Sequence, residues 1–308
     1  MNCTEERDFH FSPLSLPFHF HLLLFFGILV IYLVSVSGNL LLIGLVYAVP
    51  LLHTPMYFFL CNLSVQDIVY VSATLPKFLS VTISGDSGIP FSDCMMQMFF
   101  FTFCVGAEFC LLAFMAYDRY VAICVPLCYT TIMNPNLCVA LCSVAWLVGF
   151  CNSFAHAVIL SNLFFCRSRV ISHFYCDLKT MIELSSSDIT KIQTMVSVEC
   201  IFLGVIPFVL ILSSYTCIIV TIVNIQSPAG RWKTFSSCSS HLIILILFYG
   251  PSLGSYLIPQ SEHSKQQNKM LSLLYIALVP MLNPLVYSLR NKQVFRAVEL
   301  LIERYRKY

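Results

Sequence analysis

The stretch FMAYDRYVAICV, residues Phe114 to Val125, decides how the rest of the chain is interpreted. It places Asp118 and Arg119 side by side at the end of an apolar run that reaches back to about Met95. A charge at the centre of a bilayer costs about 3 kcal/mol on insertion scales, so this pair belongs where lipid gives way to water. The run therefore predicts a membrane helix with a charged pair at one end, at the boundary between lipid and water. Taken alone, the pair is also compatible with a surface ion pair.

The composition of the whole chain favours the membrane interpretation. Of 308 residues, 58% are hydrophobic and only 10% are charged, and the mean hydropathy is +0.82. Such a chain has too few polar groups to cover a soluble globule of this size. The net charge of +2 gives no support for nucleic-acid binding. The first span is expected to act as an uncleaved insertion signal, because the tail before it is acidic and aromatic and lacks a basic region.

Seven apolar stretches are long enough to cross the hydrocarbon core, which takes about 20 residues of helix. Their approximate positions are 22–48, a stretch that opens at Pro55, the run from Met95 to the charged pair, 137–160, 191–224, 234–259, and a stretch that includes 280–287. We therefore predict an all-α membrane protein with a seven-transmembrane helix bundle. The expected divisions are a tail over 1–21, the bundle over 22–290, and an amphipathic eighth helix over 291–308 on the inner membrane face.

Two acidic residues, Asp67 and Glu108, lie inside apolar spans at similar expected depths. Glu108 comes ten residues before Asp118, or about 15 Å deeper along a helix. Two carboxylates at one level repel unless a cation or a proton lies between them. One hypothesis is a bound sodium ion, held by both acids with Asn39 or Asn283 nearby. The other is a protonated acid that is hydrogen-bonded to its neighbour.

A loop of roughly thirty residues, 161–190, is much longer than the other connections and is expected to form a lid. Most of the fifteen cysteines lie in apolar runs, where they act as small hydrophobic residues. Cys94 and Cys176 instead flank predicted outer segments, and a disulfide between them would hold the lid on the bundle. Metal binding by His173 and Cys176 is disfavoured, because a disulfide-bonded cysteine has no thiolate to offer.

The chain is expected at the plasma membrane as a multi-pass protein with its amino terminus outside the cell. The basic residues divide almost evenly between the two sides, so raw counts do not fix the orientation. The sequon at Asn2, the cysteine placement and the basic tail after Arg290 agree on an outward amino terminus. Asn2 is the predicted glycosylation site.

Five motifs resemble those of rhodopsin-like G-protein-coupled receptors and, within that class, odorant receptors. They are LHTPMYFFLCNLS (52–64), MAYDRYVAIC (115–124), SY (214–215), KTFSSCSSHL (233–242) and PMLNPLVYSLRN (280–291). Their order along the chain makes the resemblance specific, and it covers about residues 38–291. It implies a receptor that binds an odorant and activates a stimulatory heterotrimeric G protein, raising cyclic AMP. It implies neither an enzyme nor a required cofactor.

The resemblance also implies roles for single residues. Arg119 is expected to be held by Asp118 at rest and released to the G protein when the sixth span swings outward. The implied activation switch comprises Asp118, Arg119, Tyr120, Tyr215, His241, Asn283, Pro284 and Tyr287. The resemblance also matches the buried acid pair Asp67 and Glu108 and the lid disulfide Cys94–Cys176.

Positions that match the odorant pocket of the family give a predicted ligand-binding set. It consists of Phe101, Thr102, Val105, Glu199, Cys200, Leu203, Tyr249, Ser252, Leu253, Tyr256 and Ile276. Largely apolar walls with a few hydroxyls suit a small volatile or weakly polar organic molecule. Glu199 is the unusual member, expected either to favour an amine or a hydroxyl donor or to bond back to the lid.

The sequence departs from the family pattern at the second lid disulfide. Ser186 stands where the partner of Cys166 is expected, which leaves Cys166 as a free thiol or as a partner for Cys3. Two other classes of protein also bury polar residues in the membrane. A secondary transporter using Asp67 and Glu108 should show inverted repeats, which the sequence lacks. An intramembrane hydrolase would need a serine and histidine at matching depth, whereas the serine run before His241 lies at the end of a span.

Overall fold

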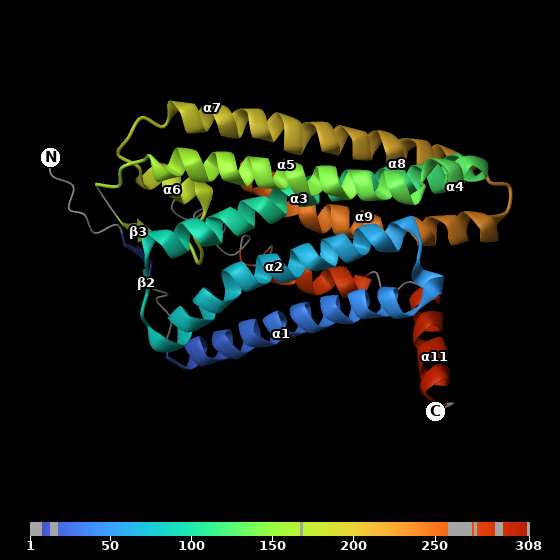
Figure 1. Ribbon diagram of the computed structural model, residues 1–308, viewed down its shortest axis with the longest axis horizontal. Helices are drawn as coiled ribbons and strands as arrows, with labels where there is room; N and C mark the ends of the chain where they lie inside the picture. Colours follow the sequence, from blue (N-terminus) through green and yellow to red (C-terminus); the bar gives the residue numbers. More distant parts are fainter. Residues whose placement is uncertain are drawn as a thin grey trace.

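The computed structural model describes residues 8–12, 18–166, 169–257, 273, 276–286 and 292–306. The long helices lie side by side as a bundle (Figure 1). Four of them are α1 (Phe18–Ala48), α2 (Pro55–Ser84), α3 (Phe91–Cys124) and α5 (Pro135–Ser161). The next span is continuous from α7 (Thr190–Glu199) through the π-helix η3 (Cys200–Val205) into α8 (Ile206–Asn224). It is followed by α9 (Pro228–Leu257) and by a helical segment over Ile276–Val286.

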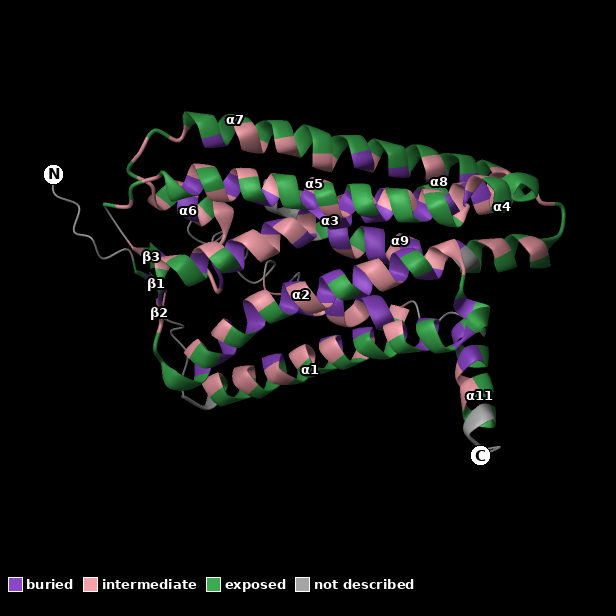
Figure 2. Ribbon diagram, in the orientation of Figure 1, coloured by how far each residue is buried: buried purple, intermediate pink, exposed green. Residues whose placement is uncertain are grey.

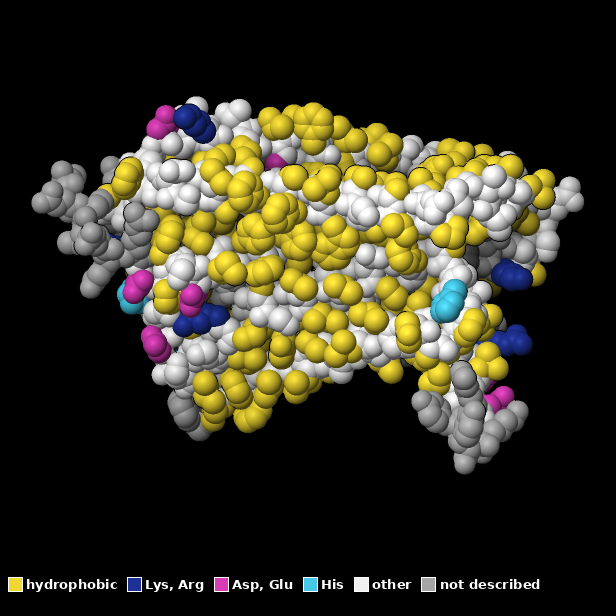
Figure 3. Space-filling model, viewed as in Figure 1, with side chains coloured by type: hydrophobic (Ala, Val, Ile, Leu, Met, Phe, Trp, Pro, Cys, Tyr) yellow, Lys and Arg dark blue, Asp and Glu magenta, His cyan; other side chains and the backbone are white. Residues whose placement is uncertain are grey.

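The bundle is a seven-transmembrane membrane fold, as predicted. Within the described ranges, five helical segments are long and apolar enough to cross a bilayer, and Cys238–Gly250 and Ile276–Val286 are shorter apolar helices. The outward faces of α1, α5 and α8 are exposed (Figure 2) and rich in leucine, valine and phenylalanine. Figure 3 shows hydrophobic side chains over the middle of one face, with the coloured charged side chains mainly toward its two ends. That distribution is the one expected of a lipid-facing surface.

The helix ends follow from local sequence signals. Pro55 and Pro135 occupy first-turn positions, where the missing N–H costs nothing. The side chain of Asn134 caps α5 by accepting a hydrogen bond of 2.9 Å from the Leu137 N–H. Gly85 ends α2 with φ of +73°, a left-handed conformation that glycine adopts without strain.

The helix α3 runs through the middle of the bundle and packs against α2, α5 and α8. The two helices α3 and α5 approach each other closely at Gly106 and Gly149. A Cβ atom added to Gly149 would lie 2.5 Å from the carbonyl oxygen of Phe103 and 3.0 Å from the backbone nitrogen of Ala107. Small residues allow membrane helices to approach in this way. This close approach fixes how α3 and α5 are set against each other.

At the end of the bundle that carries the lid, here called the lid end, the chain forms a three-stranded sheet. The middle strand is β1 (Phe9–Phe11) from the amino-terminal tail. It pairs antiparallel with β2 (Gly88–Ile89), with Phe9 opposite Ile89, and parallel with β3 (Val170–Ile171), with Phe11 opposite Ile171. Phe9 is buried and its ring lies 5.2 Å from that of Phe165 in the lid. The tail is therefore part of the cover over this end.

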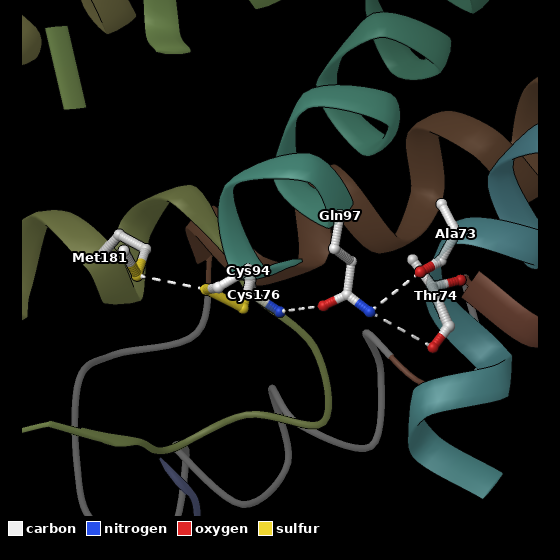
Figure 4. The surroundings of a disulfide bond; sticks show 6 residues. All are labelled: Ala73, Thr74, Cys94, Gln97, Cys176 and Met181. Atoms are coloured by element: carbon white, nitrogen blue, oxygen red, sulfur yellow. Dashed lines mark hydrogen bonds between the residues drawn. A yellow bond between two sulfur atoms is a disulfide. The ribbon is translucent and has the colours of Figure 1, made fainter. Parts of the chain in front are cut away.

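The predicted disulfide between Cys94 and Cys176 is present and joins the start of α3 to the lid (Figure 4). The Gln97 side chain reinforces this junction. Its oxygen accepts a hydrogen bond of 2.8 Å from the Cys176 N–H, and its amide nitrogen donates to the carbonyls of Ala73 at 3.0 Å and Thr74 at 3.5 Å. One turn of α3 is thus tied to both the lid and α2.

The lid, residues 162–189, also contains the short helix α6 (Leu178–Leu184). Cys166 lies in this lid and is disulfide-bonded, which corrects the expectation of a free thiol. The pairing with Cys3 that the sequence left open falls on a residue outside the described ranges. Ser186, which replaces the family cysteine, instead accepts a hydrogen bond of 3.2 Å from the Cys166 N–H.

The opposite end, here called the arginine end because it carries Arg119, contains three short elements. They are η1 (Pro50–Leu52), η2 (Pro126–Cys128) and α4 (Tyr129–Ile132). The segment between the predicted spans 191–224 and 234–259 is largely helical, because α9 already begins at Pro228. The amphipathic tail forms α11 (Lys292–Arg306), which leaves the bundle at a steep angle to α1 (Figure 1). Val294 and Ala297 are the buried residues of its described side chains.

Candidate functional site

The predicted acid pair lies in a buried polar centre between helices. Asp67 accepts a hydrogen bond of 2.9 Å from the Asn283 amide, and Glu108 accepts one of 3.1 Å from the Gln66 amide. All four residues are at most 4% exposed, and the two carboxyl groups are close enough to interact electrostatically. The similar depth inferred from the sequence agrees with the structure, in which α2, α3 and the segment 276–286 bring the two acids near each other.

Several oxygen atoms in this polar centre lack a donor. Among the described residues, Glu108 Oε1, Asn283 Oδ1, Gln66 Oε1 and Asn39 Oδ1 are buried without a hydrogen-bond partner. Asn39 donates through its amide nitrogen to the Pro280 carbonyl at 3.1 Å, which joins α1 to the same region. Buried acceptors without donors are unfavourable, so this collection of oxygens is suited to a cation or to added protons.

At the arginine end, Asp118 and Arg119 form the predicted pair. Arg119 Nε donates to Asp118 Oδ2 at 3.0 Å, and a second bond runs from Arg119 Nη2 to the same oxygen. Asp118 is fully buried, whereas the Arg119 side chain is 16% exposed. The Tyr129 hydroxyl of α4 donates to Asp118 Oδ1 at 2.8 Å. Burial and the neighbouring Asp118 charge raise the pKa of Tyr129, so this hydroxyl keeps its proton and remains a donor.

A second polar contact links α8 to α9 close to Arg119. The Tyr215 hydroxyl lies 2.8 Å from His241 Nδ1, and both side chains interact electrostatically with Arg119. Tyr120 is half-buried, with its ring 6.3 Å from that of Tyr117. The structure thus brings Asp118, Arg119, Tyr215 and His241 together.

The remaining predicted switch residues lie elsewhere. Asn283 and Pro284 are buried in the segment Ile276–Val286. This segment packs close to α1, because a Cβ atom added to Gly38 would lie 3.2 Å from Pro284 Cγ. Tyr287 lies outside the described residues.

The predicted ligand-binding residues point in three directions around α3. The first direction is toward α2 and the lid, where the Phe101 ring lies 5.3 Å from Tyr70 and 5.0 Å from Tyr175. Ile276 lines a small recess on this side. Thr74, Leu75, Phe78, Phe174, Tyr175 and Leu273 form the rest of its lining.

The second direction is toward α5. The Thr102 hydroxyl lies 3.1 Å from Ser153 Oγ, and Ser153 itself donates to the Phe99 carbonyl at 2.6 Å. The Glu199 carboxylate accepts a hydrogen bond of 2.9 Å from the Asn152 amide. The alternative expectation is that Glu199 bonds back to the lid. In the structure, its partners Asn152 and His156 lie on α5 instead.

The third direction is toward α8 and α9, where Tyr249 lies among aromatic rings. Its ring centroid is 5.7 Å from Phe109, 5.1 Å from Phe208 and 5.3 Å from Phe248. Tyr249 is 8% exposed, and its buried hydroxyl has no hydrogen-bond partner among the described residues. A buried hydroxyl without a partner is costly, so this atom is available to a polar group on a bound molecule.

The other predicted positions are less constrained. Val105 and Leu203 are half-buried, and Cys200 is exposed. The side chains of Ser252, Leu253 and Tyr256 and the glycosylation site Asn2 lie outside the described residues.

Sequence reasoning missed several partners of these residues. His156 and Asn152 contact Glu199, Tyr129 bonds Asp118, and Gln66 bonds Glu108. His156 carried a usable signal, because an ionisable residue inside an apolar span is a functional candidate by default. Tyr129 carried none, because a tyrosine beside a span end is common at membrane interfaces.

The seven-helix bundle, the disulfide-held lid and the Asp118–Arg119 pair at the opposite end define a receptor of the rhodopsin-like, G-protein-coupled class. The family model described as olfactory receptor matches residues 28–304. The chain is 42% identical to olfactory receptor 2M2 of Homo sapiens over 90% of this chain and 80% of that protein. It is 41% identical to olfactory receptor 2T5 of Homo sapiens (98% and 96% covered) and 42% identical to olfactory receptor 1E16 of Mus musculus (97% and 95%).

The chain therefore belongs to the olfactory receptor family. Members of this family are G-protein-coupled receptors for small odorants and are not enzymes. This membership confirms the interpretation of the sequence as a receptor rather than as an intramembrane hydrolase.

Proposed function

We propose that this receptor binds small, mostly apolar organic molecules within the helix bundle and activates a stimulatory G protein, which raises cyclic AMP. The ligand part of the proposal is carried by the buried Tyr249 hydroxyl, which has no hydrogen-bond partner within the described ranges and lies among the rings of Phe109, Phe208 and Phe248. A site with apolar walls and one such hydroxyl suits a volatile molecule with a single hydroxyl, carbonyl or ester group.

The arginine end supports the signalling part of the proposal. Arg119 is partly exposed, whereas its partner Asp118 is buried and also held by Tyr129. Tyr215 and His241 connect α8 to α9 beside this pair, so an outward movement of α9 must change the surroundings of Arg119. A ligand shifts such an equilibrium only by its differential affinity for the two states, and a shift from 1:99 to 99:1 takes about 5.5 kcal/mol. We therefore propose that a small odorant gives partial activation and that the G protein supplies the remainder.

The first experiment measures cyclic AMP in cells that express the receptor during exposure to a chemically diverse panel of volatiles. Agonists should raise cyclic AMP, and the rise should be absent in matched cells that lack the stimulatory Gα subunit. Tyr249→Phe should lower the potency of hydroxyl and carbonyl agonists up to about tenfold, the equivalent of one hydrogen bond of about 1.4 kcal/mol. Matched hydrocarbon agonists should keep their potency. Agonist-evoked coupling that persists without that Gα subunit would assign another type of G protein.

We further propose that the lid end faces outward at the plasma membrane, with the amino terminus outside the cell. The support is the Cys94–Cys176 disulfide, since disulfides persist in oxidising compartments. The basic residues of α11, among them Arg296, lie at the opposite end, where anionic lipids of the inner leaflet attract positive charge. The sequon at Asn2 then lies on the side where glycosylation occurs.

We also propose a sodium ion at the buried polar centre. The residues fit such an ion, because Glu108 Oε1 and Asn283 Oδ1 are buried acceptors without a donor among the described residues. Hard cations prefer oxygen ligands, and a positive charge would compensate two adjacent carboxylates. When bound, the ion would supply that charge, while Gln66 and Asn283 hold the carboxylates in place.

Sodium is expected to stabilise the purified receptor against heat. At a sodium concentration of 100 times the dissociation constant, binding to the folded state adds about 2.7 kcal/mol. The midpoint of thermal unfolding should therefore rise by several degrees in sodium chloride compared with the chloride of a large inert cation at equal ionic strength. Glu108→Gln should remove the difference. Equal midpoints for the wild type in both salts would favour the shared proton instead.

A further inference from the structure

A second polar cluster is formed by Glu199, a member of the predicted ligand-binding set, with Asn152 and His156 of α5. A Cβ atom added to Gly106 of α3 would lie 3.7 Å from Asn152 Nδ2 and 3.8 Å from Leu203 Cδ1. The cluster therefore sits where α3, α5 and the π-helix η3 meet. Gly106 directly follows Val105 in the predicted ligand-binding set.

Both oxygens of Glu199 are already engaged by α5. Oε1 accepts from the Asn152 amide at 2.9 Å, and Oε2 lies 3.1 Å from His156 Nε2. The carboxylate lies off the direction of the ring N–H, so the contact with His156 is electrostatic rather than an aligned hydrogen bond. The His156 side chain is fully buried, whereas that of Glu199 is 24% exposed.

The surroundings of the imidazole determine where its protons lie. His156 Nδ1 is 3.0 Å from the Asn152 carbonyl oxygen. A carbonyl oxygen only accepts, so Nδ1 carries a proton. The other ring nitrogen lies 3.1 Å from a carboxylate oxygen, and two lone pairs at that distance would repel unless one of the two atoms carries a proton. His156 and Glu199 together then carry no net charge, either as an imidazolium with a carboxylate or as two neutral groups.

We propose that His156 determines the charge class of the ligand by neutralising Glu199, so that this receptor selects uncharged molecules and excludes ammonium ions. The inference rests on the proposed function, because it concerns which odorants the receptor binds. A pocket with an uncompensated carboxylate would attract an amine. Here the imidazole occupies the place that an ammonium group would take, and the amide of Asn152 occupies the other oxygen. Because the Glu199 side chain is 24% exposed, its carboxylate can still accept a hydrogen bond from a neutral hydroxyl group.

The test removes the imidazole and asks whether an amine takes its place. His156→Ala leaves a ring-sized space beside Glu199, and the purified receptor is then heated with increasing hexylammonium chloride. The ion should raise the midpoint of thermal unfolding of this variant at concentrations at least tenfold lower than those needed for the wild type. 1-Hexanol, which has the same chain length without the charge, serves as the matched probe and should act equally on both proteins.

Two further variants keep the test decisive. His156→Ala combined with Glu199→Gln removes both charges and should lose the response to hexylammonium. His156→Gln keeps a side chain of similar length and replaces His156→Ala if the latter does not fold. A difference of less than threefold between the wild type and the single variant would overturn the proposal, as would an equal response in the double variant. The measurement needs neither agonist nor G protein, so absence of signalling by the wild type would count against the proposed function alone.

Discussion

Replacement of Arg119 by leucine is expected to abolish agonist-evoked nucleotide exchange on the G protein. Arg119 is the partly exposed member of a pair whose other member, Asp118, is fully buried. It is also the cation beside Tyr215 of α8 and His241 of α9. Hydrogen bonds to charged groups contribute about 1.5 to 3 kcal/mol each. Loss of one or two such bonds to the G protein corresponds to a decrease of about 100-fold or more in exchange.

The controls separate signalling from folding. Arg231→Leu removes a charge of the same sign from an exposed position of α9 and should leave exchange nearly unchanged. Asp118→Asn removes the carboxylate that holds the guanidinium and should raise exchange in the absence of agonist. Each variant is compared at equal amounts of receptor delivered to the cell surface. Normal agonist-evoked exchange by a delivered Arg119→Leu receptor would refute the switch described for the arginine end.

Replacement of Gly149 by alanine is expected to be the most damaging single-methyl change in the described bundle. The new Cβ would lie 2.5 Å from the Phe103 carbonyl oxygen and 3.0 Å from the Ala107 nitrogen. Both are backbone atoms of α3, so no side chain can rotate away, and α5 must move outward. Overpacking of this kind costs about 3 kcal/mol, the upper part of its usual range. The midpoint of thermal unfolding and the fraction of receptor at the cell surface should both fall sharply.

Gly44→Ala is the matched control for this variant. Gly44 lies within α1, another membrane helix, and an added Cβ would have nothing within 4 Å. Alanine is favoured over glycine in a helix by roughly 0.5 to 1 kcal/mol, so this change should be neutral or slightly stabilising. A Gly149→Ala receptor as stable as the Gly44→Ala receptor would show that α3 and α5 are not as close as described.

The spans and the ends of the bundle could be predicted from sequence because they depend on local signals. Apolar runs of about 20 residues mark helices in lipid, and Pro135 marks a helix start within two residues of the predicted boundary. The meeting of Asp67 with Glu108 followed from counting residues along two antiparallel helices. The disulfide Cys94–Cys176 followed from the position of each cysteine beside an outer segment.

Features that depend on how helices are rotated about their axes could not be predicted. The predicted pocket set treats Thr102 and Glu199 as facing one cavity, yet both side chains bond to α5. The rotation of α5 is set by the contact of Gly149 with α3, which no local pattern encodes. The strand β1 was missed for a related reason. Three residues carry too little pattern to indicate a strand, and its partners lie far away in the sequence.

The pairing of β1 also constrains the order in which the receptor can be assembled on the ribosome. His10 pairs with Gly88 and with Val170, so its second partner is synthesised 160 residues later. At 5 to 20 residues per second, the tail waits on the order of 10 to 30 s for that partner. During this interval, Phe9 and Phe11 cannot both be buried as they are in the finished sheet, so the unfinished chain exposes two aromatic side chains that the folded receptor covers.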